Sequence, residues 1–149
     1  MTDMPGVESS ITPYLIAKDA GAAIAFYAAA FGAEERYRLT DPHSGKIGHA
    51  ELRIGDAGFM LADEHADFGA FAPPTIGGTP VLLHLSVADA DATVASAERA
   101  GAIVLLAVKD QMYGERSGMI ADPFGHHWMI GTPIETVSPE EMQARYAGV

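Results

Sequence analysis

A pattern of about 70 residues occurs twice in the chain, and this repeat limits the possible folds more than any other feature. A predicted strand precedes Asp19, which caps a helix that ends at Gly32. The same order returns with Asp89, 70 residues after Asp19, and with Gly101, 69 residues after Gly32. Because three alternating segments follow each helix, the pattern predicts two β-α-β-β-β modules and an α+β fold.

The boundaries follow from turn residues and from the change of hydrophobic period. The first module is expected at 10–64, a linker loop at 65–78, the second module at 79–132, and a tail with a short helix at 133–149, the two modules forming one structural domain. The strands are predicted at 11–17, 34–40, 47–54, 57–62, 81–87, 103–109, 116–122 and 128–131, and the two main helices at 20–31 and 90–100.

Composition narrows the function classes. The chain has 149 residues, nine Lys and Arg against twenty Asp and Glu, and a formal net charge of −11, which repels a phosphate backbone or an anionic membrane. No cysteine is present, so disulfides and thiolate chemistry are excluded. Without a basic, apolar N-terminal segment or a run of roughly 20 apolar residues, we expect a cytoplasmic protein with no membrane segment.

The last predicted hairpin carries a pair of histidines. A tight turn at Asp122-Pro123-Phe124-Gly125 precedes His126 and His127. Since side chains alternate along a strand, His127 and Met129 are predicted on one face, and His126 and Trp128 on the other. One of these faces packs in the core, and the other is free to line a cavity.

The two modules, the helix end Ala-Phe-Tyr-Ala-Ala-Ala-Phe-Gly at 25–32 and the motif Asp-Pro-Phe-Gly-His at 122–126 together resemble the vicinal oxygen chelate superfamily. This is the fold of glyoxalase I, extradiol dioxygenases and bleomycin resistance proteins. Segments 54–56, 60–64, 113–116 and 137–141 are similar to its PhnB-like branch. The resemblance implies that each module curls its mixed sheet around a cavity, with its helix outside. Because one fold hosts many functions, the resemblance does not identify the chemistry.

Metal-using members of that superfamily place ligands on the first and last strands of each module. The resemblance puts Thr12, Met60, Leu82 and Met129 at these positions. Leucine has no lone pair and thioethers are soft ligands, so we predict no metal site and no cofactor. A shift of one or two residues would bring His84 or His127 closer to the ligand positions. A divalent ion stays possible if the protein is an enzyme of this superfamily, with His84, Glu51 or other displaced residues as ligands.

With the cavity face taken from this alignment, the predicted ligand-binding residues share an inward position or the turn at the cavity mouth. They are Tyr14, Met60, His84, Met112, Tyr113, Arg116, His127 and Met129. His84 is either a core histidine or a ligand contact, and His127 faces either solvent or the pocket. Arg116 either binds a substrate carboxylate bidentately or closes the turn with its neighbour Glu115.

The candidates for catalysis are His49, Glu51 and His84. His49 and Glu51 share one face of a strand and form either a pair that moves a proton near neutral pH or an exposed cross-strand salt bridge.

Three functions remain. The first is a small-molecule binding protein of the bleomycin resistance type, with a metal-free, methionine-lined cavity, a resistance or sequestration role, and a homodimer interface. The second is a metal-dependent lyase, isomerase or dioxygenase. The third is a structural homodimer that has lost its chemistry. The sequence favours the first.

Overall fold

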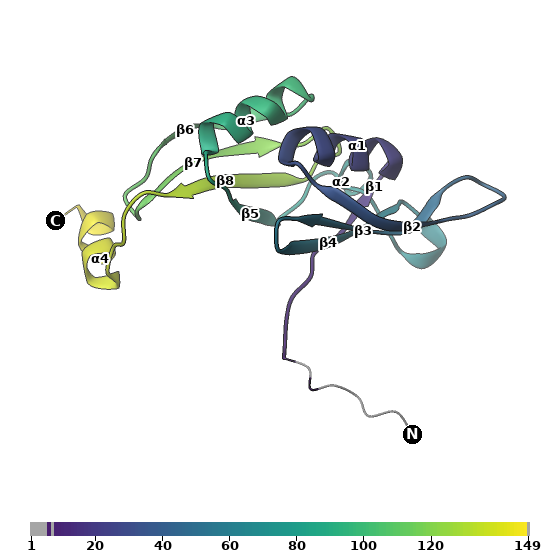
Figure 1. Ribbon diagram of the computed structural model, residues 1–149, viewed down its shortest axis with the longest axis horizontal. Coiled ribbons are helices and arrows are strands. Elements are labelled where there is room, and N and C mark those ends of the chain that lie inside the picture. The colour runs from purple at the N-terminus through teal and green to yellow at the C-terminus, as the bar shows by residue number, and fades with distance from the viewer. Residues whose placement is uncertain (1–5, 7, 149) are drawn as a thin grey trace.

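The computed structural model describes residue 6 and residues 8–148, and its strands form two sheets with a helix on each (Figure 1). The first module contains β1 (Tyr14–Ala17), α1 (Ala20–Phe31), β2 (Glu34–Thr40), β3 (Ile47–Ile54) and β4 (Ala57–Asp63). The connection contains η1 (Ala66–Phe68) and α2 (Pro73–Ile76). The second module contains β5 (Leu82–Ser86), α3 (Ala90–Arg99), β6 (Ile103–Asp110), β7 (Glu115–Ala121) and β8 (His127–Pro133), and α4 (Pro139–Ala147) follows it. The α+β fold with two β-α-β-β-β modules is confirmed.

Both sheets have the same strand order, as expected if the sequence repeat encodes two similar modules. The orders are β1-β4-β3-β2 and β5-β8-β7-β6. In each sheet the first strand pairs in parallel with the last, so that Tyr14 lies beside Met60 and His84 beside Met129. The remaining pairs are antiparallel hairpin neighbours.

The two main helices begin as the sequence predicts. The Asp19 carboxylate accepts a hydrogen bond from the Ala22 N–H at 3.0 Å, and the Asp89 carboxylate accepts one from Ala92 at the same distance. Gly32 ends α1 with φ of 70°, a conformation that glycine adopts without steric cost. The two helices contact one another along the junction of the modules.

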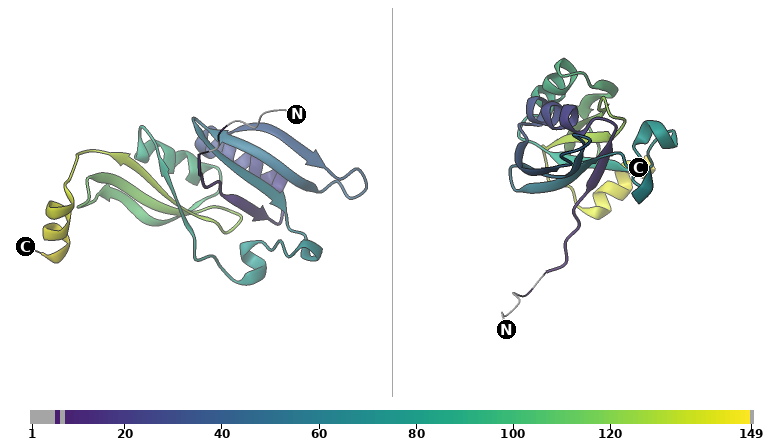
Figure 2. Two further views of the ribbon diagram at one scale, coloured as in Figure 1. Left: turned by 90° about the horizontal axis from the view of Figure 1, so that it is seen from below. Right: turned by 90° about the vertical axis from the view of Figure 1, so that its right-hand side faces the viewer.

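The core lies between these helices and one face of each sheet. Its side chains include Leu15, Leu61, Ile120, Trp128 and Ile130, all below 7% exposed. Viewed from below, both sheets lie in front of α1 and α3, so the two faces without helices point to the same side (Figure 2). We call these the open faces of the sheets.

The Asp122 carboxylate joins the two modules at their junction. It is 4% exposed and accepts hydrogen bonds from the Tyr27 hydroxyl at 2.5 Å and the Trp128 indole N–H at 2.9 Å. The backbone N–H groups of Phe124 and His126 also donate to it, at 2.9 and 3.0 Å. Burial, and then the neighbouring carboxylate, raise the pKa of Tyr27 well above its ordinary value, which keeps this hydroxyl a donor.

The His126 side chain adds a second contact between the modules, because its Nε2 donates to the Ile16 carbonyl at 2.9 Å. Asp122 and His126 belong to the hairpin that the sequence marks, whereas Tyr27 and Ile16 belong to the first module. The hairpin is therefore a clasp between the modules, a role that its turn motif alone does not indicate.

Most predicted elements agree with the structure to within one or two residues at each end, and two segments differ more. The first strand begins at Tyr14 and not at residue 11, since Pro13 has no N–H to donate and only its carbonyl joins the sheet, accepting from Met60. The loop at 65–78 contains two short helical turns, in part because Pro73 and Pro74 favour the first positions of a helix.

The expectations for the N-terminal segment and for Val149 concern positions 1–5, 7 and 149, which lie outside the described residues. Within the described chain, none of the helices has the length and hydrophobicity that crossing a bilayer requires.

Candidate functional site

The open faces hold most of the side chains that the sequence predicts for a ligand site. Across the first sheet, the strand register places Tyr14, Met60, Glu51 and Tyr37 in one row. Across the second sheet, His84, Met129, Met119 and Leu106 form the corresponding row. Leu15 and Ile130, next to residues of these rows, are buried on the helix side, as the alternation predicts.

On the first open face, Tyr14 and His49 form a polar pair. The Tyr14 hydroxyl is 2.7 Å from His49 Nδ1. Desolvation, and then the nearby Tyr37, raise the pKa of Tyr14 above its ordinary value, so the Tyr14 hydroxyl stays protonated near neutral pH. His49 thus bonds to Tyr14 and not to Glu51. Desolvation, and then the Glu51 carboxylate, raise the pKa of Tyr37 above its ordinary value. The predicted pair of His49 and Glu51 is not what the structure forms.

On the second open face, His84 bonds to Glu115, a residue that the sequence does not single out for this role. His84 Nε2 is 2.8 and 3.0 Å from the two carboxylate oxygens. The carboxylate lies over Gly131, where an added Cβ would be 2.2 Å from Glu115 Cδ. Close by, the Tyr113 hydroxyl is 3.1 Å from Ser117 Oγ. A bond across 31 residues of sequence depends on the order β5-β8-β7, which no local pattern shows.

Replacing Gly131 with Ala is expected to separate His84 from Glu115 without unfolding the protein. The new methyl group takes the space of the carboxylate, which is the mobile end of a long side chain, so the free energy of unfolding should fall by less than about 1.5 kcal/mol. The ring ¹⁵N signals of His84 in NMR spectra should shift toward those of Glu115→Gln. Gly48→Ala is the matched control, since the nearest atom to its Cβ is 3.9 Å away. Unchanged His84 signals in Gly131→Ala would contradict the assigned contact.

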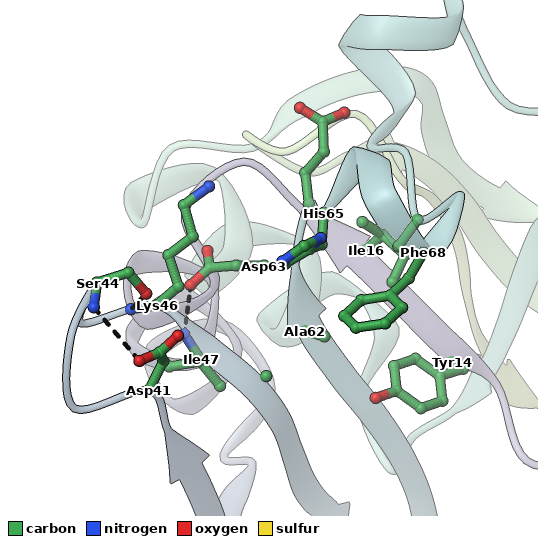
Figure 3. Close-up of a pocket in the computed structure, with 13 residues that line it drawn as sticks. Tyr14, Ile16, Asp41, Ser44, Lys46, Ile47, Ala62, Asp63, His65 and Phe68 are labelled. Atoms are coloured by element: carbon green, nitrogen blue, oxygen red, sulfur yellow. Dashed lines mark hydrogen bonds between the residues drawn. The ribbon is translucent and has the colours of Figure 1, made fainter.

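The largest cavity opens at the end of the first open face (Figure 3). It measures about 580 Å³, within the range of roughly 300–1,000 Å³ of small-molecule sites. Its lining comes from β1, β3, β4, the β2–β3 turn and the η1 loop: Tyr14, Ile16, Asp41, Ser44, Lys46, Ile47, Gly48, Ala62, Asp63, Glu64, His65, Phe68 and Ala70. Of the predicted ligand-binding residues, only Tyr14 lines it.

The methionines gather elsewhere. A smaller cavity of about 170 Å³ on the second sheet is lined by Tyr113, Met119 and Met129, among others. Met60 lies beside Tyr14 on the first open face, and His127 lies half-buried beside Leu82 on the second. Met112 lies in the β6–β7 turn, where its carbonyl accepts a hydrogen bond from Arg145. The methionine lining predicted from sequence is thus absent from the largest cavity.

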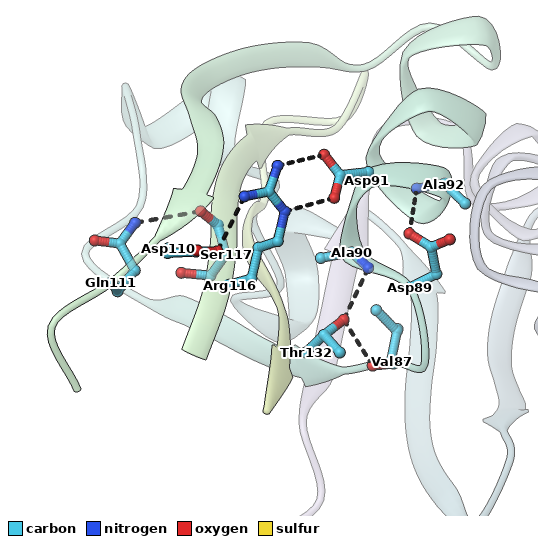
Figure 4. Close-up of polar contacts among 10 residues, drawn as sticks. All are labelled: Val87, Asp89, Ala90, Asp91, Ala92, Asp110, Gln111, Arg116, Ser117 and Thr132. Atoms are coloured by element: carbon cyan, nitrogen blue, oxygen red, sulfur yellow. Dashed lines mark hydrogen bonds and ion pairs between the residues drawn. The ribbon is translucent and has the colours of Figure 1, made fainter. Parts of the chain in front are cut away.

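Arg116 does not belong to the open face. It alternates with Glu115 and so points to the helix side of β7, where its guanidinium donates to both oxygens of Asp91, at 2.7 and 3.0 Å, and to Asp110 at 3.0 Å (Figure 4). These bonds raise its pKa above the ordinary value for arginine and lower the pKa of Asp91. In the structure the donors that would form a bidentate contact with a substrate carboxylate bind Asp91 instead, and Arg116 does not close the turn with Glu115.

The donor set does not fit the divalent ion of the fold's metal-using members. The residues that the structure describes contain no group of three or more His, Asp or Glu side chains arranged to hold a metal. Met60 and Met129 occupy two of the four strand positions that the resemblance assigns to ligands, and thioether sulfur is a poor donor for a hard cation.

The fold and its open faces define a class: two-module α+β proteins with a cavity on the side of the sheets away from the helices. Residues 10–130 match the family described as Glyoxalase/Bleomycin resistance protein/Dioxygenase superfamily. The chain therefore belongs to this superfamily, the vicinal oxygen chelate proteins.

Two similar proteins and two solved structures illustrate the relationship. The uncharacterized protein Rv0887c of Mycobacterium tuberculosis is 45% identical over 141 residues, covering 93% of this chain and 82% of that protein. The Arabidopsis thaliana protein At5g48480 is 27% identical over 133 residues, covering 85% of this chain and 80% of that protein. Its crystal structure has a TM-score of 0.63 and covers 83% of this chain and 98% of its own. TioX from Micromonospora, at 24% identity and a TM-score of 0.66, covers 85% of this chain and 100% of its own and shows the shared fold.

Proposed function

We propose that the protein binds a small organic molecule, without a metal, in a cavity on the open faces of its sheets. It acts as a binding protein of the glyoxalase and bleomycin resistance type, with a resistance or sequestration role. Within the superfamily we assign it to the PhnB-like branch. The observation that carries this proposal is the cavity of about 580 Å³, which is lined by residues of β1, β3 and β4 and of two loops.

The exposed apolar side chains of the open faces support a homodimer as the form that binds the ligand. Six large apolar side chains are at least 43% exposed on the open faces: Tyr14, Tyr37, Leu39, Leu82, Ile103 and Leu106. Apolar surface on this scale usually marks an interface or a ligand groove. Because both open faces point to the same side, a second copy is able to cover them together (Figure 2).

A thermal-shift screen of aromatic compounds and antibiotics tests the proposal. A compound at 100 times its Kd should stabilise the protein by about 2.7 kcal/mol. The same compound should give no shift with Ala70→Phe, because the phenyl ring fills the cavity that Ala70 lines. Ala29→Phe, at an exposed position of α1, is the matched control and should keep the shift. A shift that survives in Ala70→Phe would place the ligand elsewhere and refute the proposed site.

Metal content separates this proposal from the alternative of a metal-dependent lyase, isomerase or dioxygenase, which rests on superfamily membership. Protein purified without a histidine tag should contain much less than one equivalent of Ni, Zn, Fe or Mn by elemental analysis. Near-stoichiometric metal would favour the enzyme instead.

A further inference from the structure

The largest cavity has an aromatic side and a charged side. The rings of Tyr14 and Phe68 lie at one side, and Asp41, Ser44 and Lys46 lie at the other (Figure 3). The sheet supplies an apolar floor of Ile16, Ile47 and Ala62. Phe68 is 83% exposed on the η1 loop, so its ring is available to a ligand at the rim. A molecule that satisfies both sides has a flat apolar body and one polar end.

The three carboxylates around the cavity are bonded to backbone N–H groups of the protein. The two Asp63 oxygens accept from Ala20 and Ile47, both at 2.7 Å, and one Glu64 oxygen accepts from Ala72 at 2.8 Å. Asp41 accepts from His43 at 2.8 Å and from Ser44 at 3.4 Å, and these two N–H groups lower its pKa. These carboxylates structure the turns around the cavity, and backbone dipoles offset part of their negative charge.

Lys46 differs from the carboxylates, since it forms no ion pair with any residue that the structure describes. It follows the β2–β3 turn, and its ammonium group offers three donors at the charged side of the cavity. His65 lies between the two sides, with its ring centroid 4.5 Å from that of Phe68, and offers a further ring nitrogen. The polar groups still open to a ligand therefore include donors that suit an anionic oxygen.

We propose that this cavity binds a planar aromatic carboxylate, with the ring between Tyr14 and Phe68 and the carboxylate at Lys46. This inference rests on the proposed binding function and adds the ligand class. The ring buries apolar surface and contacts aromatic side chains, which gives affinity regardless of charge. Lys46 supplies the preference for an anion by a charge-assisted hydrogen bond.

Three probes with the same ring system and different charge test the proposal: 2-naphthoate, 2-naphthylmethanol and 2-naphthylmethylammonium. Isothermal titration of the full chain should show 2-naphthoate binding about tenfold more tightly than the alcohol. Lys46→Met should lower the affinity for 2-naphthoate to that for the alcohol, whereas Phe68→Ala should weaken the binding of both probes. Lys109→Met removes a lysine of β6 that is not among the lining residues, and it should leave the preference intact.

The outcomes separate the ligand class from the proposed binding function. Tighter binding of the ammonium probe, or a naphthoate preference that persists in Lys46→Met, would overturn the carboxylate site. Equal affinity for the alcohol and naphthoate would also overturn it, while leaving small-molecule binding in place. If none of the three probes binds, the inference fails, and the wider thermal-shift screen still decides the proposed function.

Discussion

Replacing Asp122 with Ala should lower the free energy of unfolding by about 3–5 kcal/mol, a large part of the stability of a typical domain. The carboxylate is 4% exposed and holds four donors, and two of these, the Tyr27 hydroxyl and the Trp128 indole N–H, come from side chains in the core. The variant leaves these donors buried without an acceptor, which is the costly way to lose a hydrogen bond. Urea unfolding followed by Trp128 fluorescence measures the change.

Two further variants identify the cause. Asp122→Asn keeps the shape but places an NH₂ group against donors, so we expect an intermediate loss. Tyr27→Phe removes a donor and leaves the acceptor with its other partners, so it should cost about 1–2 kcal/mol. Asp110→Ala is the surface control, since its partner Arg116 retains Asp91, and it should leave stability nearly unchanged. A loss below about 1 kcal/mol for Asp122→Ala would show that the clasp contributes little.

Much of the fold could be predicted because its signals are local and repeated. Asp19 and Asp89 cap helices that start where predicted, and the period of two places Leu15 and Trp128 on the buried face. The role of Asp122 could not be predicted in the same way. Its sequence signal is a turn, while its partner Tyr27 is 95 residues away and meets it only when the two modules pack.

The candidate site was less predictable for a physical reason: its contacts join strands that are distant in sequence. The strands of Glu115 and His84 lie on either side of β8. Glu115 reaches His84 across β8 because Gly131 has no side chain to occupy the space between them. Arg116 was expected in the site because the turn before β7 borders the cavity mouth, but the alternation along β7 points it to the helix side. The largest cavity depends on a helical turn at Ala66–Phe68, in a segment that the sequence predicts only as a linker loop.

The protein should behave in solution as a dimer of its 15.7 kDa chain, and a charge on either open face should dissociate it. Leu39 is 60% exposed on the first open face and Leu106 is 59% exposed on the second. In a two-fold dimer each substitution occurs twice, so Leu39→Glu or Leu106→Glu buries two carboxylates without partners. We expect each variant to raise the dimer dissociation constant by roughly 100-fold or more, measured by analytical ultracentrifugation over a range of concentrations.

The control for this prediction is Ala25→Glu, which adds the same charge to the exposed side of α1, on the far side of the sheets from the open faces, and should leave the dimer intact. Sedimentation of the wild-type chain as a monomer at all concentrations would refute the homodimer. Dissociation by only one of the two leucine variants would show that the copies do not pair both open faces.

Because Tyr14 belongs both to the first open face and to the lining of the largest cavity, loss of the dimer should also lower the affinity for any ligand that reaches Tyr14. Titration of Leu106→Glu with such a ligand measures that coupling, since Leu106 itself is not among the residues that line the largest cavity.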